Sequence, residues 1–122
     1  MRLFLKCLVI ATVIAIGSAS LPPCNSAKAE QGSVIRITAK RYEYNPNRVI
    51  LKKGMPVTLE LTSLDRIHGF NCPDLAIRTD ILPGKTSIIR FTPAKTGIFP
   101  FHCDIFCGEG HETMAGEFIV GE

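Results

Sequence analysis

The chain has 122 residues, which is enough for one ordinary domain and too short for two. Its 14 Lys and Arg against 11 Asp and Glu give a formal charge of +3, but three of the basic residues and none of the acidic ones lie before position 30. Residues 30–122 are therefore neutral, which argues against a protein that binds nucleic acid or acidic membranes. A hydrophobic content of 46% excludes a disordered chain.

The first 29 residues have the plan of a secretory signal peptide. Residues 1–6 carry two positive charges, residues 8–16 are almost wholly apolar, and residues 27–29 have the A-x-A form of a cleavage site. The alternative is an uncleaved membrane anchor, which needs about 20 predominantly apolar residues, more than this run offers. We therefore expect residues 1–29 to be a signal peptide and residues 30–122 to be one exported domain, in the periplasm or an equivalent compartment.

The five cysteines raise the question of redox compartment. Cys7 and Cys24 would leave with the signal peptide; a lipoprotein-type signal that retains Cys24 is an alternative that the two preceding prolines disfavour. Cys72, Cys103 and Cys107 remain, and an odd number of cysteines cannot form a complete set of disulfides within one chain. In an oxidising compartment at least one of these thiols therefore needs another role.

The rest of the chain favours short strands over helices. Apolar residues recur at every second position, most clearly in Val57–Ser63, and no stretch keeps a helical period for three turns. In chain order the predicted strands are 33–40, 49–51, 57–63, 86–92, 98–103 and 115–120. Gly and Pro turns between such strands predict an all-β domain with a β-sandwich architecture. Tyr42, Tyr44 and Pro46 form an aromatic corner that we expect to serve packing.

One segment between two predicted strands concentrates metal-binding side chains. Read as ligands, it has the pattern Cys-x3-Cys-x3-His-x2-Met, made by Cys103, Cys107, His111 and Met114. Thiolate, imidazole and thioether groups are soft ligands that select copper or zinc over magnesium, calcium or manganese. A blue-copper site with one metal ion uses two His, one Cys and a weak axial Met. This segment therefore lacks one His and has a second Cys.

The missing imidazole has two candidates elsewhere in the chain. His68 lies in a loop after the clearest predicted strand, where a scaffold presents ligands, whereas His102 precedes Cys103 on a strand and should point to the opposite face. We therefore predict His68 as the ligand, and His102 as an outer-face residue or one that supports the ligands without binding the metal. Three alternatives compete with copper: a disulfide between Cys103 and Cys107, a Cys2His2 zinc site that has no use for Met114, and Met114 as an ordinary core residue.

The same residues resemble the CuA domain of cytochrome c oxidase subunit II, a domain also found in nitrous oxide reductase. The resemblance covers most of residues 30–122 and depends above all on the loop motif and its upstream histidine. It extends through the segments 48–51, 65–70, 81–84, 91–92, Gly97 and 103–114. The fold implied by the resemblance is the cupredoxin-like Greek-key β-sandwich.

The resemblance also implies a binuclear centre of two copper ions. The implied ligands are two bridging thiolates, one imidazole for each copper and one weak axial ligand for each copper: in that order Cys103 and Cys107, His68 and His111, the thioether of Met114 and the backbone carbonyl of Ile105. Subunit II usually has a glutamate at the position of Ile105, and the side chain of that glutamate reaches a metal. The hydrocarbon side chain of Ile105 cannot do this. Phe70, Phe101 and Phe106 are candidates for the apolar shell around the sulfur atoms.

The function implied by the resemblance is one-electron transfer. We expect an exported CuA-type protein that passes single electrons between redox partners, such as a cytochrome c or a copper-dependent enzyme. One alternative is a periplasmic copper carrier that loads another enzyme; a second is a subunit II-like component through which electrons enter a terminal oxidase or reductase. Independent catalysis is not expected, because a saturated copper site leaves no open position.

Charge and one remaining thiol lead to two further expectations. Residues 96–122 contain five acidic residues and no basic ones, so we expect an acidic surface at the metal loop, including Glu109 and Glu112, that steers a basic partner; the alternative is ordinary solvated surface charge. Cys72 is interpreted as a buried small hydrophobe; the alternative is a spare thiol that influences copper loading.

Overall fold

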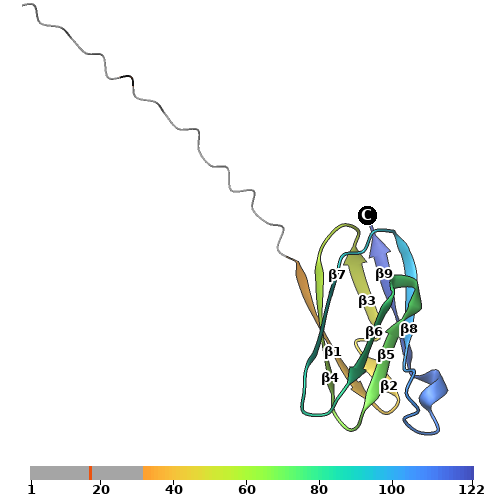
Figure 1. Ribbon diagram of the computed structural model, residues 1–122. Helices are drawn as coiled ribbons and strands as arrows, with labels where there is room; N and C mark the ends of the chain where they lie inside the picture. The colour runs from red at the N-terminus through yellow and green to blue at the C-terminus, as the bar shows by residue number, and fades with distance from the viewer. Residues whose placement is uncertain (1–16, 18–31) are drawn as a thin grey trace, which may run out of the picture.

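The computed structural model describes Gly17 and residues 32–122 (Figure 1). The predicted signal peptide, Gly17 apart, lies outside the described residues. None of the described segments forms a helix with the length and apolar character needed to cross a membrane. In chain order the elements are β1 (Ser33–Lys40), β2 (Glu43–Asn45), β3 (Arg48–Lys52), β4 (Val57–Ser63), β5 (His68–Cys72), the 3-10 turn η1 (Pro73–Leu75), β6 (Ile77–Ile81), β7 (Ser87–Phe91), β8 (Gly97–His102), the 3-10 turn η2 (His111–Thr113) and β9 (Ala115–Gly121).

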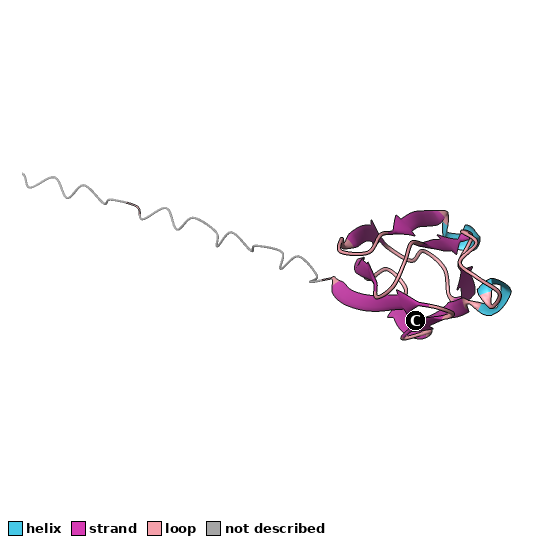
Figure 2. Cartoon of the chain, turned by 90° about the horizontal axis from the view of Figure 1, so that it is seen from below, coloured by secondary structure: helices cyan, strands magenta, loops and turns pink. Residues whose placement is uncertain are grey.

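The strands form two sheets that face each other (Figures 1 and 2). One sheet has the order β2-β1-β4-β7 and the other the order β3-β9-β8-β5-β6. β1 pairs with β4 and β3 pairs with β9 in parallel, so both sheets join strands that are far apart in the chain. The remaining neighbours pair antiparallel. This arrangement confirms the predicted all-β sandwich.

The six predicted strands match β1, β3, β4, β7, β8 and β9 to within one residue at each end, whereas β2, β5 and β6 were not predicted. Four of the five positions of β5 are buried, Gly69 among them, so this strand lacks the alternation that marks a half-buried strand. The structure also corrects the predicted place of His68, which is the first residue of β5 and pairs with Ile81 of β6.

The core lies between the sheets and is filled by alternate residues of the strands. On β4, Val57, Leu59 and Leu61 are buried, while the residues between them are partly exposed. Four aromatic rings with centroids 4.7–6.1 Å apart fill one part of this core: those of Tyr44, Phe70, Phe101 and Phe118. Removing one such buried ring typically costs about 3–5 kcal/mol, so the rings form a rigid base for the strand ends beside them.

Candidate metal centre

Two segments meet at one end of the sandwich. The first is the turn between β4 and β5, which leads into His68. The second is the segment between β8 and β9, residues 103–114, which we call the metal loop and which appears in blue in Figure 1. Because β5 and β8 are antiparallel neighbours, the beginning of β5 lies beside the end of β8. This topology places His68 next to Cys103.

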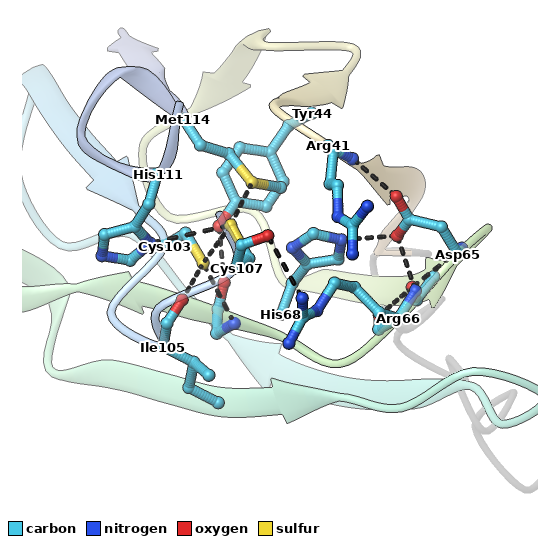
Figure 3. Close-up of polar contacts among 12 residues, drawn as sticks. Arg41, Tyr44, Asp65, Arg66, His68, Cys103, Ile105, Cys107, His111 and Met114 are labelled. Carbon is cyan, nitrogen blue, oxygen red and sulfur yellow. Dashed lines mark hydrogen bonds and ion pairs between the residues drawn. The ribbon is translucent and has the colours of Figure 1, made fainter. Parts of the chain in front are cut away.

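The metal loop gathers its three other predicted ligand groups around Cys103 and Cys107, whose Sγ atoms lie 4.0 Å apart (Figure 3). Cys107 Sγ is 3.7 Å from Nδ1 of His111 and 3.9 Å from Sδ of Met114. Cys103 Sγ is 3.2 Å from the carbonyl oxygen of Ile105. Gly110 is the N-cap residue of η2, the 3-10 turn that begins with His111. The loop therefore folds back on itself and directs all these groups toward the two sulfur atoms.

The two cysteines are free thiols in a buried environment. Cys103 is 3% exposed and Cys107 is fully buried, as is Met114. A disulfide requires an S–S distance near 2 Å, so the sulfur atoms are not joined at 4.0 Å. Burial raises the pKa of Cys107, the neighbouring Cys103 adds to this rise, and the positive charge of Arg66 partly opposes it. A metal ion that replaces the thiol protons would relieve this unfavourable burial of charge.

His68 completes the cluster from the opposite side. Its donor atom and the Sγ atoms of Cys103 and Cys107 all lie within 4.8 Å of one another. The ring is fully buried, its Nε2 is 2.7 Å from Oδ1 of Asp65, and its Nδ1 has no hydrogen-bond partner among the described residues. A buried imidazole nitrogen without a partner is unfavourable unless it binds a ligand. The donor set therefore fits a soft metal such as copper.

Asp65 fixes the orientation of His68, and the sequence reasoning did not identify it. Its carboxylate also accepts hydrogen bonds from the backbone N–H groups of Arg41, at 2.8 Å, and Arg66, at 2.6 Å. Burial alone would raise the pKa of Asp65, but the hydrogen bonds from Arg41, His68 and Arg66 outweigh it and lower the pKa to about 2. An ionised carboxylate on Nε2 leaves Nδ1 of His68 free to bind a metal. The signal for this role was the position of Asp65, three residues before the predicted ligand.

Gly69 brings β5 close to the start of the metal loop. Its N–H donates to Cys103 Sγ at 3.4 Å, and its carbonyl accepts a hydrogen bond from the hydroxyl of Tyr44. A Cβ atom at this position would lie 1.9 Å from Oδ1 of Asp104, so only glycine allows the approach. Burial raises the pKa of Tyr44, and this hydroxyl stays protonated as a donor.

An ion pair holds the exit of β8. Arg78 of β6 donates to both carboxylate oxygens of Asp104, at 2.9 and 3.0 Å, and also bonds Asp80. Hydrogen bonding to Arg78 lowers the pKa of Asp104, so this carboxylate is ionised. Two parallel N–H···O bonds restrict geometry more than one does. The pair therefore fixes the backbone immediately after Cys103.

Tyr42 supports the other half of the metal loop. A Cβ atom at Gly108 would lie 2.3 Å from the Tyr42 hydroxyl oxygen, and one at Gly110 would lie 2.4 Å from a ring carbon of Tyr42. Gly108 also has a φ of +138°, which side-chain-bearing residues rarely adopt. Tyr42 packs on the loop and Tyr44 lies in the core, in agreement with the packing role expected for this corner.

The three phenylalanines expected to surround the sulfur atoms differ in burial. Phe70 and Phe101 are fully buried in the core, but Phe106 is 72% exposed. Phe106 lies in the metal loop, outside the strands, so it does not contribute a buried ring. Its ring centroid is 5.8 Å from that of His111, which is itself partly exposed. Phe106 therefore forms part of the molecular surface next to His111.

Cys72 lies apart from the cluster. It occupies the far end of β5 from His68, about 13 Å along the strand at the usual rise per residue. Its side chain is buried, its sulfur is 4.0 Å from the carbonyl oxygen of Phe99, and burial raises its pKa. This environment supports its interpretation as a small core residue. His102 is exposed, as predicted.

The acidic surface is smaller than the charge count suggests. Asp104 pairs with Arg78, and the other two paired acids of this segment, Glu117 and Glu122, bond Arg48 and Lys53. Glu109 and Glu112 are the exposed acids of the metal loop for which the described residues provide no ion pair.

Curated relatives and solved structures agree with the resemblance. Cytochrome c oxidase subunit 2 of Thermus thermophilus is 33% identical over 88 residues, which cover 72% of this chain and 65% of that protein. Nitrous-oxide reductase of Ralstonia nicotianae is 36% identical over 90 residues, which cover 70% of this chain and 14% of that enzyme. The chain thus spans less than two thirds of the length of these relatives.

Three solved structures share the fold. The periplasmic domain of subunit II of cytochrome oxidase from Bradyrhizobium japonicum has a TM-score of 0.69 and 23% identity, over 74% of this chain and 84% of that one. Subunit II in a mixed disulfide with a thioredoxin-like protein has a TM-score of 0.64 and 20% identity, over 80% and 88%. The metal binding domain of the Cu(I)-exporting ATPase of Streptococcus pneumoniae, solved with Cu(I), has a TM-score of 0.56 and 26% identity, over 73% and 85%.

The sequence also matches a wider protein family. Residues 7–120 match the cupredoxin-like domain. This match includes every strand of both sheets except the last residue of β9, and it includes the whole metal loop. The chain therefore belongs to the cupredoxin-like domain family and is related to the CuA domains of cytochrome c oxidase subunit II and nitrous-oxide reductase.

Proposed function

We propose that residues 30–122 form an exported CuA-type domain that holds two copper ions and passes single electrons between redox partners. The proposed ligands are the six predicted groups: the side chains of His68, Cys103, Cys107, His111 and Met114, and the carbonyl of Ile105. Bound copper would supply a one-electron couple in which the charge is shared between two ions. The protein would supply a buried, rigid set of donors that changes little when that electron arrives or leaves.

The observation that carries this proposal is the placement of the two imidazoles. The donor atoms of His68, Cys103 and Cys107 lie within 4.8 Å of one another, but the ring of His111 is outside this group although its Nδ1 is 3.7 Å from Cys107 Sγ. Four donors around one zinc ion, at about 2.0–2.3 Å each, would all lie within about 4 Å of one another. Imidazoles on different sides of a cysteine pair support two metal positions over one.

The rigidity of the site supports a role in electron transfer. His68 is held by Asp65, and Cys103 accepts the N–H of Gly69. The exit of β8 is tied by the pair of Asp104 with Arg78. Such fixed donors reduce the rearrangement that accompanies a change of charge, and hydrogen bonds to the sulfur atoms tune the potential.

The test is the copper content of the purified protein together with the electron paramagnetic resonance spectrum of its oxidised form. We expect two copper ions per chain and one unpaired electron shared between both nuclei, which gives more hyperfine lines than one copper nucleus can. One copper ion per fully loaded chain, with the pattern of a single nucleus, would overturn the binuclear proposal.

Copper delivery is the second candidate function, and the partial exposure of His111 favours it, because a partly exposed ligand gives a partner access to the metal. Its Nδ1 is 3.7 Å from the Sγ of the buried, free Cys107, and a relative by fold was solved with Cu(I). A carrier must release its metal quickly, whereas an electron-transfer site must keep it. Transfer of copper to a competing chelator within seconds would favour delivery, and retention over hours would favour electron transfer.

The partners proposed for this end of the molecule are of two kinds. A redox protein such as a cytochrome c, or a copper-dependent enzyme, would approach the metal loop, where Glu109 and Glu112 supply unpaired negative charge. A thioredoxin-like reductant would act before loading, since oxidation of Cys103 and Cys107 to a disulfide would remove both bridging thiolates. The mixed disulfide formed by subunit II with a thioredoxin-like protein supports this second class of partner.

A further inference from the structure

Arg66 lies between the two segments that form the site, the turn that leads into His68 and the metal loop. It lies in the turn between β4 and β5, two residues before His68. Its N–H donates to Oδ1 of Asp65 at 2.6 Å, and its carbonyl accepts a hydrogen bond from the hydroxyl of Ser63. The backbone of Arg66 is therefore held at two points, which fixes where its side chain begins.

The side chain of Arg66 reaches across to the metal loop (Figure 3). Its Nη1 donates to the carbonyl oxygen of Cys107 at 3.4 Å, which links the turn that carries His68 to the loop that carries the other ligands. Its Nε is buried and has no hydrogen-bond partner among the described residues. The nearby Asp65 carboxylate already accepts hydrogen bonds from two backbone N–H groups and contacts the ring of His68. Within the described part of the chain, no acid forms an ion pair with this guanidinium.

A guanidinium without a paired acid next to a metal site has an electrostatic consequence. Its charge is permanent at all ordinary pH values, and partial burial limits the screening of that charge by salt. Reduction adds one negative charge to the centre. A fixed positive charge nearby stabilises the reduced form more than the oxidised form.

We propose that Arg66 is a positioning residue that joins the two halves of the centre through the Cys107 carbonyl and that raises the reduction potential of the copper bound there. This inference rests on the proposed function. At an effective dielectric constant of about 20, one unit charge about 12 Å from the centre shifts a one-electron equilibrium by about tenfold. A tenfold shift corresponds to 59 mV.

The test compares three variants of the copper-loaded protein by protein-film voltammetry at 0.1 M and 1 M salt. Arg66→Gln keeps a hydrogen-bond donor and removes the charge. We therefore expect the reduction potential to fall by about 59 mV, which is a tenfold change in the one-electron equilibrium constant. Arg66→Lys keeps the charge and loses the planar guanidinium group. Its equilibrium constant for reduction, calculated from the potential, should therefore stay within about twofold of that of the unaltered protein. Arg90→Gln is the matched control: Arg90 is exposed on β7, in the other sheet, and should leave the potential unchanged.

A second measurement uses the metal-free protein and tests the link itself. His111 N–H donates to the carbonyl of Gly108 within the metal loop, and its hydrogen exchange reports how well the loop is held. We expect exchange of this amide to accelerate about fivefold or more in Arg66→Met, and to stay unchanged in the control Arg90→Met.

The possible outcomes separate this inference from the proposed function. If the unaltered protein lacks the two-copper spectrum, the proposed function fails, and the exchange measurement alone then decides whether Arg66 holds the loop. If the spectrum is present but Arg66→Gln changes the equilibrium constant for reduction by less than about twofold, the proposed electrostatic effect of Arg66 is contradicted. Equal exchange rates in Arg66→Met and in the unaltered protein would contradict the positioning role.

Discussion

The approach of β5 to the metal loop gives a prediction that needs no metal. A Cβ atom at Gly69 would lie 1.9 Å from Oδ1 of Asp104, 3.0 Å from its backbone nitrogen and 3.1 Å from its Cγ. In Gly69→Ala, Asp104 must therefore move by more than 1 Å, or β5 must withdraw from β8. The first movement breaks the paired hydrogen bonds to Arg78, and the second breaks the contact with Cys103.

The expected cost follows from these losses. Overpacking of this kind typically destabilises a protein by about 1–3 kcal/mol, and the partly exposed pair of Asp104 with Arg78 contributes at most about 1 kcal/mol. We therefore expect Gly69→Ala to lower the free energy of unfolding by about 1–4 kcal/mol. For a domain of this size each kcal/mol shifts Tm by about 4–8 °C, so the Tm should fall by roughly 4–32 °C.

The assay is chemical and thermal unfolding of the metal-free protein with its thiols kept reduced. Gly121→Ala is the matched control, because Gly121 ends a strand of the same sheet and no atom lies within 4 Å of its added Cβ. This variant should be unchanged or slightly more stable. In an Asp104→Ala background the colliding carboxylate is gone, and the cost of Gly69→Ala should drop below about 1 kcal/mol. An equal cost in both backgrounds would refute the steric reasoning.

Three further changes probe the site and its surface. Asp65→Asn should weaken copper binding by about 10–100-fold, since it loosens the support of His68; competition with a chelator measures this, and an unchanged affinity would contradict the role of the carboxylate. Cys72→Ala should leave the copper content and spectrum unchanged while it destabilises the core by about 1–2 kcal/mol; an altered copper content would restore the spare-thiol alternative. Glu109→Gln with Glu112→Gln should slow association with a basic redox partner at low salt and reduce the salt dependence of the rate; stopped-flow mixing tests this, and an unchanged rate would exclude steering by the metal loop.

The strands that the sequence predicts and those it does not differ in how they are buried. β1 and β4 each present one face to the core, so their apolar residues alternate and their bounds were predicted without error. β5 is buried on both faces near the site. Its first residues are set by the needs of the site and not by an alternating pattern: His68 supplies an imidazole, Gly69 allows a close approach, and Phe70 supplies an aromatic ring. A strand of this kind carries no alternating signal. It can be recognised only from its pairing with β6 and β8 in the folded structure.

The candidate ligands and their supports differ in the same way. Cys103, Cys107, His111 and Met114 are close in the chain, so their spacing alone predicts that they converge. Their supports are residues whose nearness depends on strand pairing, and spacing along the chain does not reveal it: Tyr42, Tyr44, Asp65, Arg66, Gly69 and Arg78. Phe106 shows the opposite error, because this aromatic residue lies inside the motif and yet is exposed.

The pairing of β5 with β8 is short, and this affects how the site is assembled. The two strands share one register pair, Asn71 with His102, before β8 ends. Beyond it, the contacts that hold His68 beside Cys103 are made by Gly69, through its N–H to the sulfur and its close fit against Asp104. Metal binding across this junction would replace the missing ladder bonds with metal–ligand bonds. Copper should therefore stabilise the fold most where the two sheet strands are least joined, and its removal should increase hydrogen exchange first at the beginning of β5.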